Sequence, residues 1–302
     1  MKLRIGLWLF WLCAFSSARA DSQHSLQPSP VDRRIAKELH LRLAYQERLE
    51  ELVDKCPTRV RNKCLQTKLM KAAAFRNPQD RHLSFENFTN FHAPGGVCWG
   101  YARYQRKLLA FARFGAPRAS APRTRAQARR LLLPISWGVP MTLPGVSSIA
   151  SLSQHPVYAP EIRKLMTEMW SEEFFRPSNL AWALHMRSPA QNLQAIAELT
   201  TRTRRKELPI LVLQFSVGSQ HVVLLEKVTS REGGFEATAV DSNRPGLPQT
   251  FFFDTNGNYV AKKSANIYGA LARLGLKVVD RDEAAQDSLG LSAECCLQAE
   301  AD

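Results

Sequence analysis

Cys98 stands in a sequence context that favours a nucleophile. It follows the glycine pair Gly95-Gly96 and begins a run whose apolar residues have helical spacing. Glycines let the backbone approach a substrate closely, and the free N–H groups of a helix's first turn favour a thiolate over a thiol. We therefore expect Cys98 to begin a helix and to act as a nucleophile; the alternative is a small buried hydrophobe, the usual state of a free cysteine.

A histidine and a carboxylate follow downstream, in an order typical of thiol catalysis. His221 begins an apolar run that predicts a buried strand, which can aim the ring across a cleft as base or acid. Asp241 ends the next predicted strand, and counting back from the Gly233-Gly234 turn places it near the same end of the sheet. Asp241 could therefore orient the imidazole, with Asn243 in reserve. The alternatives are a core histidine for His221 and turn chemistry for Asn243.

Other chemistries lack a motif in this sequence. The Cys and His residues do not have the paired spacing of a zinc site. There is no phosphate-binding glycine loop and no Gly-x-Ser-x-Gly nucleophile motif. The sequence therefore predicts thiol chemistry with no metal and no cofactor.

The secondary structure that must position these residues is predicted to change along the chain. Apolar residues have helical spacing first, and short β-rich runs separated by turns follow. Residues 116–130 are expected to be a mobile basic segment passing into a short helix, and 134–160 to be irregular. Helices first and an antiparallel sheet second indicate an α+β fold. Helices are expected at about 31–54, 62–75, 98–114, 160–174, 188–206 and 264–274, and strands at about 209–216, 221–228, 235–241, 249–254 and 276–279.

The first twenty residues are typical of a secretory signal peptide. Lys2 and Arg4 precede an apolar stretch, and Ala18-Arg19-Ala20 is a small-residue cleavage site. We expect cleavage after Ala20 and a secreted or periplasmic bacterial protein. The apolar stretch is too short to span a bilayer comfortably, although an uncleaved anchor is the alternative.

In an oxidising compartment the cysteines should pair, and their number leaves one over. The chain has six cysteines, of which Cys13 belongs to the signal peptide. A bridge between the adjacent Cys295 and Cys296 would be strained, so we expect Cys56 or Cys64 to pair with one of them, or Cys56 to pair with Cys64. Cys98 is then the natural unpaired thiol.

The chain is strongly basic, with a formal net charge of +14. No acidic residue occurs between Glu86 and Glu161, where many arginines gather. This segment is either a solvated basic face or a binding surface for an anionic partner such as a membrane or a cell-wall polymer. No nucleic-acid-binding motif is present, so nucleic acid is not an expected partner. The arginines proposed for binding are Arg123, Arg125, Arg129 and Arg130.

Two motifs resemble those of the papain-like cysteine peptidases. Gly96-Val97-Cys98-Trp99 is similar to the signature around their active-site cysteine, and the separation of Cys98 and His221 is close to the usual one. The strand at His221 and the turn that begins at Asp241 are closer to the bacterial YopT-type and bacteriocin-processing branches. Val97 departs from the signature, since a serine or alanine is usual there.

The resemblance implies a helical lobe carrying Cys98 packed on an antiparallel sheet carrying His221 and Asp241, with the substrate cleft between them and Trp99 at the binding site. The implied parts are an N-terminal helical extension at 21–82, a peptidase domain at 83–280 and a C-terminal tail at 281–302. Family members place a glutamine before the cysteine to bind the oxyanion; here His92 and Asn90 are the candidates.

The resemblance implies cleavage of peptide or isopeptide bonds in a protein or peptide substrate. An acyltransferase or a cell-wall amidase could use the same triad, and a catalytically silent papain-like module could bind an anionic surface. The helical extension could be a removable prosegment; a bridge from Cys56 or Cys64 to the C-terminal pair would keep it attached.

Overall fold

The computed structural model describes residues 97–115, 120–174, 185–217, 219–268 and 274–278, together with scattered single residues and short groups within 40–85 and 287–296. The chain divides into two compact units, residues 1–46 and 47–302. Within the predicted helix at 31–54 the described residues are helical, whereas the predicted signal peptide lies outside the described residues. No helix in the described part of the chain is long and apolar enough to cross a membrane.

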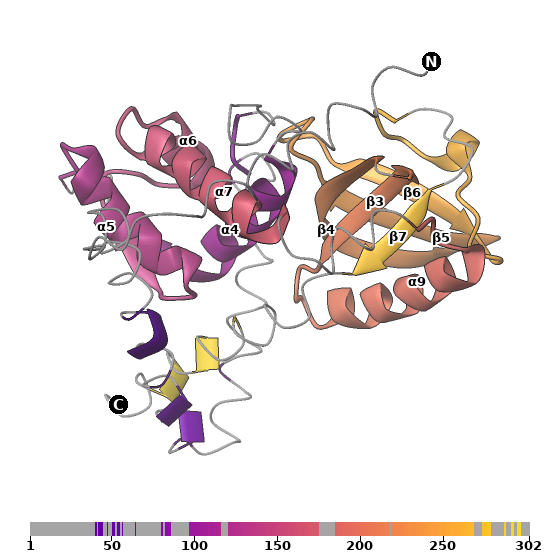
Figure 1. The fold of residues 1–302 in the computed structure, drawn as a ribbon, viewed down its shortest axis with the longest axis horizontal. Helices are drawn as coiled ribbons and strands as arrows, with labels where there is room; N and C mark the ends of the chain where they lie inside the picture. The colour runs from indigo at the N-terminus through magenta and orange to yellow at the C-terminus, as the bar shows by residue number, and fades with distance from the viewer. Residues whose placement is uncertain are drawn as a thin grey trace, which may run out of the picture. The chain divides into compact units, whose positions relative to one another are not determined.

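A helical lobe comes first in the second unit (Figure 1). The predicted helix at 98–114 ends three residues early, because residues 112–114 pair in parallel with residues 141–143 as a small two-stranded sheet. The segment 134–160, predicted to be irregular, contains the second of these strands and a short helix. The elements are α4 (Cys98–Phe111), β1 (Ala112–Phe114), α5 (Arg125–Ser136), β2 (Met141–Leu143), α6 (Ile149–Gln154) and α7 (Tyr158–Phe174).

An antiparallel sheet of five strands follows, with order β6-β5-β4-β3-β7. Helix α9 precedes it, begins with a capping box between Ser188 and Gln191, and lies along one face of the sheet (Figure 1). Residues 264–268, predicted to begin a helix, form none. The elements are α9 (Pro189–Arg204), β3 (Ile210–Ser216), β4 (Ser219–Arg231), β5 (Gly234–Val240), β6 (Gln249–Asp254) and β7 (Gly275–Val278). The fold is therefore α+β, as predicted.

The two faces of β4 bury different sets of residues. Val222 and Leu224 belong to the core around α4, whereas Val223 and Leu225 belong to the core under α9. Because successive side chains of a strand point to opposite faces, the near-continuous apolar run after His221 places this strand between two layers of helix. The strand that carries the histidine is thus held on both sides.

Two disulfides, Cys56–Cys296 and Cys64–Cys295, join residues near the two ends of the second unit. Of the two pairings that the sequence left open, the structure shows the one between the N-terminal and the C-terminal cysteines, and not a Cys56–Cys64 bridge. Among the cysteines that the structure describes, Cys98 alone is free. The region around Cys56 and Cys64 therefore stays covalently attached after any backbone cleavage between it and the domain, which argues against its being a removable prosegment.

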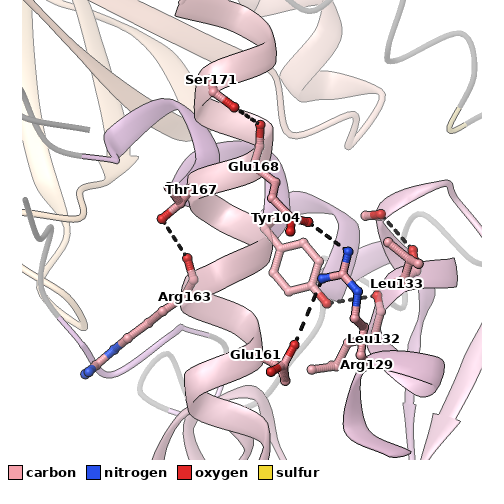
Figure 2. A network of polar contacts seen from close by, with 10 residues as sticks. Tyr104, Arg129, Leu132, Leu133, Glu161, Arg163, Thr167, Glu168 and Ser171 are labelled. Carbon is pink, nitrogen blue, oxygen red and sulfur yellow. Dashed lines mark hydrogen bonds and ion pairs between the residues drawn. The ribbon is translucent and has the colours of Figure 1, made fainter. Parts of the chain in front are cut away.

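Several basic residues from the stretch between Glu86 and Glu161 form ion pairs inside the helical lobe. Arg106 and Lys107 of α4 form buried ion pairs with Asp287, at 3.0 Å for Arg106. On α5, Arg129 lies 3.1 Å from Glu168 and 4.0 Å from Glu161, both on α7 (Figure 2). An anionic partner could therefore meet the exposed Arg123, Arg125 and Arg130 but not a free Arg129. Binding to an anionic surface is still a prediction, and it now depends on Arg123, Arg125 and Arg130.

Replacing Arg129 by alanine should lower the free energy of unfolding by about 1 to 3 kcal/mol, measured by denaturant titration. The Arg129 side chain is 14% exposed, and its loss leaves the nearly buried Glu161 carboxylate without its cation. The adjacent Arg130 is exposed, so Arg130→Ala is the matched control and should change stability by about 0.5 kcal/mol or less. Equal effects of the two substitutions would show that the α5–α7 ion pairs contribute nothing.

Candidate active site

Cys98 occupies the first position of α4. Val97, the N-cap residue, contributes no side-chain cap, and the first hydrogen bond of the helix runs from the Tyr101 N–H to the Val97 carbonyl at 2.8 Å. The N–H groups of residues 98–100 therefore precede the intrahelical ladder and favour negative charge beside them. The cysteine is nearly buried, at 7% exposure. The prediction that Cys98 begins a helix is confirmed.

His221 links Cys98 to Asp241. Its Nε2 atom lies 2.7 Å from Oδ1 of Asp241, and its ring interacts electrostatically with the Cys98 side chain. Since Nε2 is engaged by the carboxylate, Nδ1 is the ring nitrogen that remains for the sulfur. Cys98, His221 and Asp241 are all buried, so the three groups interact in a region of low dielectric. Residues from α4, from the start of β4 and from the loop after β5 are thus brought together in the predicted order.

The Asp241 carboxylate accepts hydrogen bonds on both oxygens. Besides His221, Oδ1 accepts the backbone N–H of Asn243 at 2.8 Å, and Oδ2 accepts the hydroxyl of Tyr268 at 2.5 Å. Asn243 also donates from its side chain to the Tyr268 hydroxyl at 3.3 Å. Asn243 therefore supports Asp241 instead of replacing it, and Asp241 is the residue that contacts the imidazole.

The charges of the three groups favour an imidazolium. Burial alone would lower the pKa of His221, but its electrostatic interaction with Cys98, followed by its hydrogen bond to Asp241, raises it to about 10. Burial likewise opposes ionisation of Asp241, yet the hydrogen bond and charge of His221 and the donors from Tyr268 and Asn243 hold its pKa below 3.8. The arrangement can hold an imidazolium between the Cys98 sulfur and the Asp241 carboxylate.

A bulge in β4 places Asp241 on the same face of the sheet as His221. Near the turn, Val228 pairs with Ala237, but after Glu226 the register shifts so that Leu224 pairs with Val240. Continued by one residue, the shifted register places Asp241 beside Val223, on the face of β4 that carries His221. Without the extra residue Asp241 would stand beside Leu224 and point to the opposite face.

The other residues predicted for the active site are either buried in the core or outside the described residues. Trp99 is buried in the core around α4, with 6% exposure. His92 and Asn90, the oxyanion candidates, lie outside the described residues. Tyr268 was missed, because its place beside Asp241 comes from a loop 27 residues away and leaves no spacing signal. Nowhere in the described part of the chain do three His, Cys, Asp or Glu residues gather as a metal site would require.

Comparison with known proteins adds no relative: no family model, no curated protein and no solved structure matches the chain.

Proposed function

We propose that the chain is an exported thiol hydrolase of papain-like type, which cleaves peptide or isopeptide bonds through Cys98, His221 and Asp241. The observation that carries the proposal is the buried free thiol that interacts with an imidazole, which is itself hydrogen-bonded to a buried carboxylate. Two disulfides are typical of an exported protein and support a secreted or periplasmic location.

In the proposed reaction, the Cys98 thiolate attacks the carbonyl carbon of the scissile amide and forms a thioester after the amine leaves. The His221 imidazolium gives its proton to that amine and becomes a neutral base. It then takes a proton from water, whose oxygen attacks the thioester; the acid product leaves, and the thiolate–imidazolium pair returns. Asp241 keeps Nε2 protonated and holds the ring in place throughout.

Variants of the proposal share the first half of this reaction. An acyltransferase would accept an amine or hydroxyl nucleophile in place of water, and a cell-wall amidase would differ in substrate alone. A silent module that binds an anionic surface would need no reactive thiol. The hydrogen-bonded imidazolium beside Cys98 favours a catalytic chain over the silent module.

The test is the alkylation of Cys98 by iodoacetamide as a function of pH, under non-reducing conditions. His221 holds its proton up to a pKa of about 10 against an ordinary 6.5, so the charge that stabilises the thiolate is present at neutral pH and lost above about pH 10. Cys98 should therefore react at pH 6 to 7. In His221→Ala the reaction should be slow at this pH and should rise only under more alkaline conditions, because the thiolate has lost its cation.

Mass spectrometry of the alkylated protein identifies the site. Modification confined to Cys98, with the four bridged cysteines unmodified, agrees with the proposal. Identical pH profiles for wild type and His221→Ala, or no selective reaction at neutral pH, would overturn it and leave the silent module as the better hypothesis.

A further inference from the structure

We infer that Tyr268 is a positioning residue that fixes the Asp241 carboxylate in the orientation His221 requires. The inference rests on the proposed function and extends it beyond the three residues of the triad. It is built from the hydrogen bonds and ring contacts that converge on Tyr268.

The hydroxyl of Tyr268 completes the shell of donors around Asp241. Oδ2 accepts from Tyr268 at 2.5 Å, while Oδ1 accepts from His221 and from the Asn243 backbone. Donors on three separate segments thus hold the two oxygens. The carboxylate cannot rotate away from the imidazole without breaking at least one of these bonds, which is costly for a group with no solvent exposure.

The sense of the Tyr268 hydrogen bond is also fixed. The Asn243 side-chain N–H can only donate, so the Tyr268 oxygen accepts from it at 3.3 Å and its own proton is left for Asp241. Burial, followed by the nearby charge of Asp241, raises the pKa of Tyr268 well above its ordinary value. The phenol therefore stays protonated, and it remains a donor at every pH at which the site would work.

The ring of Tyr268 is held by aromatic neighbours on two strands of the sheet. Its centroid lies 4.9 Å from that of Phe215 on β3 and 6.2 Å from that of Phe251 on β6. It also lies 5.7 Å from the ring of His221. Aromatic pairs prefer specific geometries, so Phe215 and Phe251 help to orient the Tyr268 hydroxyl toward Asp241. The ring contacts thus restrict the orientation of a residue that lies in a loop.

Among the residues that the structure describes, the titratable groups that interact with Asp241 are His221, Tyr101 and Tyr268, and the first two have other roles. Cys98 and His221 form the reactive pair, and Tyr101 of α4 donates its hydroxyl to the Leu83 carbonyl at 2.8 Å, away from the carboxylate. Tyr268 remains as the neutral group that donates directly to Oδ2. Since a donor favours the charged form of a carboxylate, loss of this hydroxyl must raise the pH at which Asp241 takes up a proton.

The test is Tyr268→Phe, which keeps the ring and removes the hydroxyl. We expect kcat/KM to fall about 10- to 100-fold through kcat, with KM little changed, and the acid limb of its pH profile to move up by about half a unit or more. Titration of active sites with iodoacetamide corrects for any unfolded fraction. Tyr259→Phe is the matched control: its hydroxyl contacts Asn266, and the acid limb should not move.

An unmoved acid limb and an unchanged kcat in folded Tyr268→Phe would overturn the inference. If Tyr268→Phe does not fold, Asn243→Ala replaces it, because that variant removes the donor that orients the hydroxyl; a smaller shift in the same direction supports the inference, and no shift overturns it. If the wild type hydrolyses no substrate, the proposed function fails; the pH profile of Cys98 alkylation in the same variants then decides on Tyr268 separately.

Discussion

Replacing Cys98 by alanine should abolish hydrolysis, and replacing His221 by alanine should lower kcat/KM by at least about a thousandfold. The alanine at position 98 leaves no group to form the thioester. The alanine at position 221 removes the proton donor for the leaving amine and the positive charge that stabilises the thiolate. The measurement is steady-state hydrolysis of a set of fluorogenic peptide and isopeptide substrates, with enzyme concentration corrected by active-site titration.

Two comparisons make this result specific. His155→Ala removes a histidine outside the site, whose Nδ1 accepts the Val157 N–H at 3.2 Å, and should leave kcat/KM within about twofold of wild type once folding is corrected. The double variant Cys98→Ala/His221→Ala should be no less active than Cys98→Ala alone, because residues that act as a unit are not additive. Residual activity of Cys98→Ala above that of the double variant would contradict the proposed roles.

The sheet could be predicted well because its signals are local. The strand at Gln249–Asp254 has the predicted bounds, and the Gly233-Gly234 turn joins β4 to β5 where the sequence indicated. Gly234, with φ of 157°, lies so close to β6 that an added Cβ would stand 2.0 Å from the Phe253 carbonyl. A side chain there would collide with backbone, and this is the kind of constraint that glycine patterns report.

The site was predictable in its members but not in its geometry. Counting along β5 placed Asp241 at the correct end of the sheet, yet the count without a bulge would have put it on the wrong face. Glu226 carries no signal of a bulge, since a register shift depends on the pairing of both strands and not on one residue type. Tyr268 is the same case: only the folded loop brings its hydroxyl to Asp241. The candidate catalytic residues can be recognised from their residue types. The register between strands and the position of a loop beside the site depend on the tertiary structure.

Gly100→Ala is expected to destabilise the fold by about 3 kcal/mol or more, against the ordinary preference of helices for alanine. Helices α4 and α7 cross at this position so closely that an added Cβ would lie 1.8 Å from the Met166 carbonyl oxygen. That atom is backbone inside α7, so it cannot swing aside, and the two helices must separate. Cys98 lies half a turn earlier on the same helix, so the displacement would also carry the thiol away from His221.

Gly115→Ala is the matched control for this effect. An added Cβ at Gly115 would meet the Leu143 carbonyl oxygen at 3.5 Å, an ordinary van der Waals contact, and the stability of this variant should stay within about 1 kcal/mol of wild type. Denaturant unfolding gives both free energies, and alkylation at pH 7 reports whether Cys98 still contacts the imidazolium. A Gly100→Ala protein as stable and as reactive as wild type would mean that α4 does not cross α7 at Gly100, and that the position of Cys98 beside His221 has another cause.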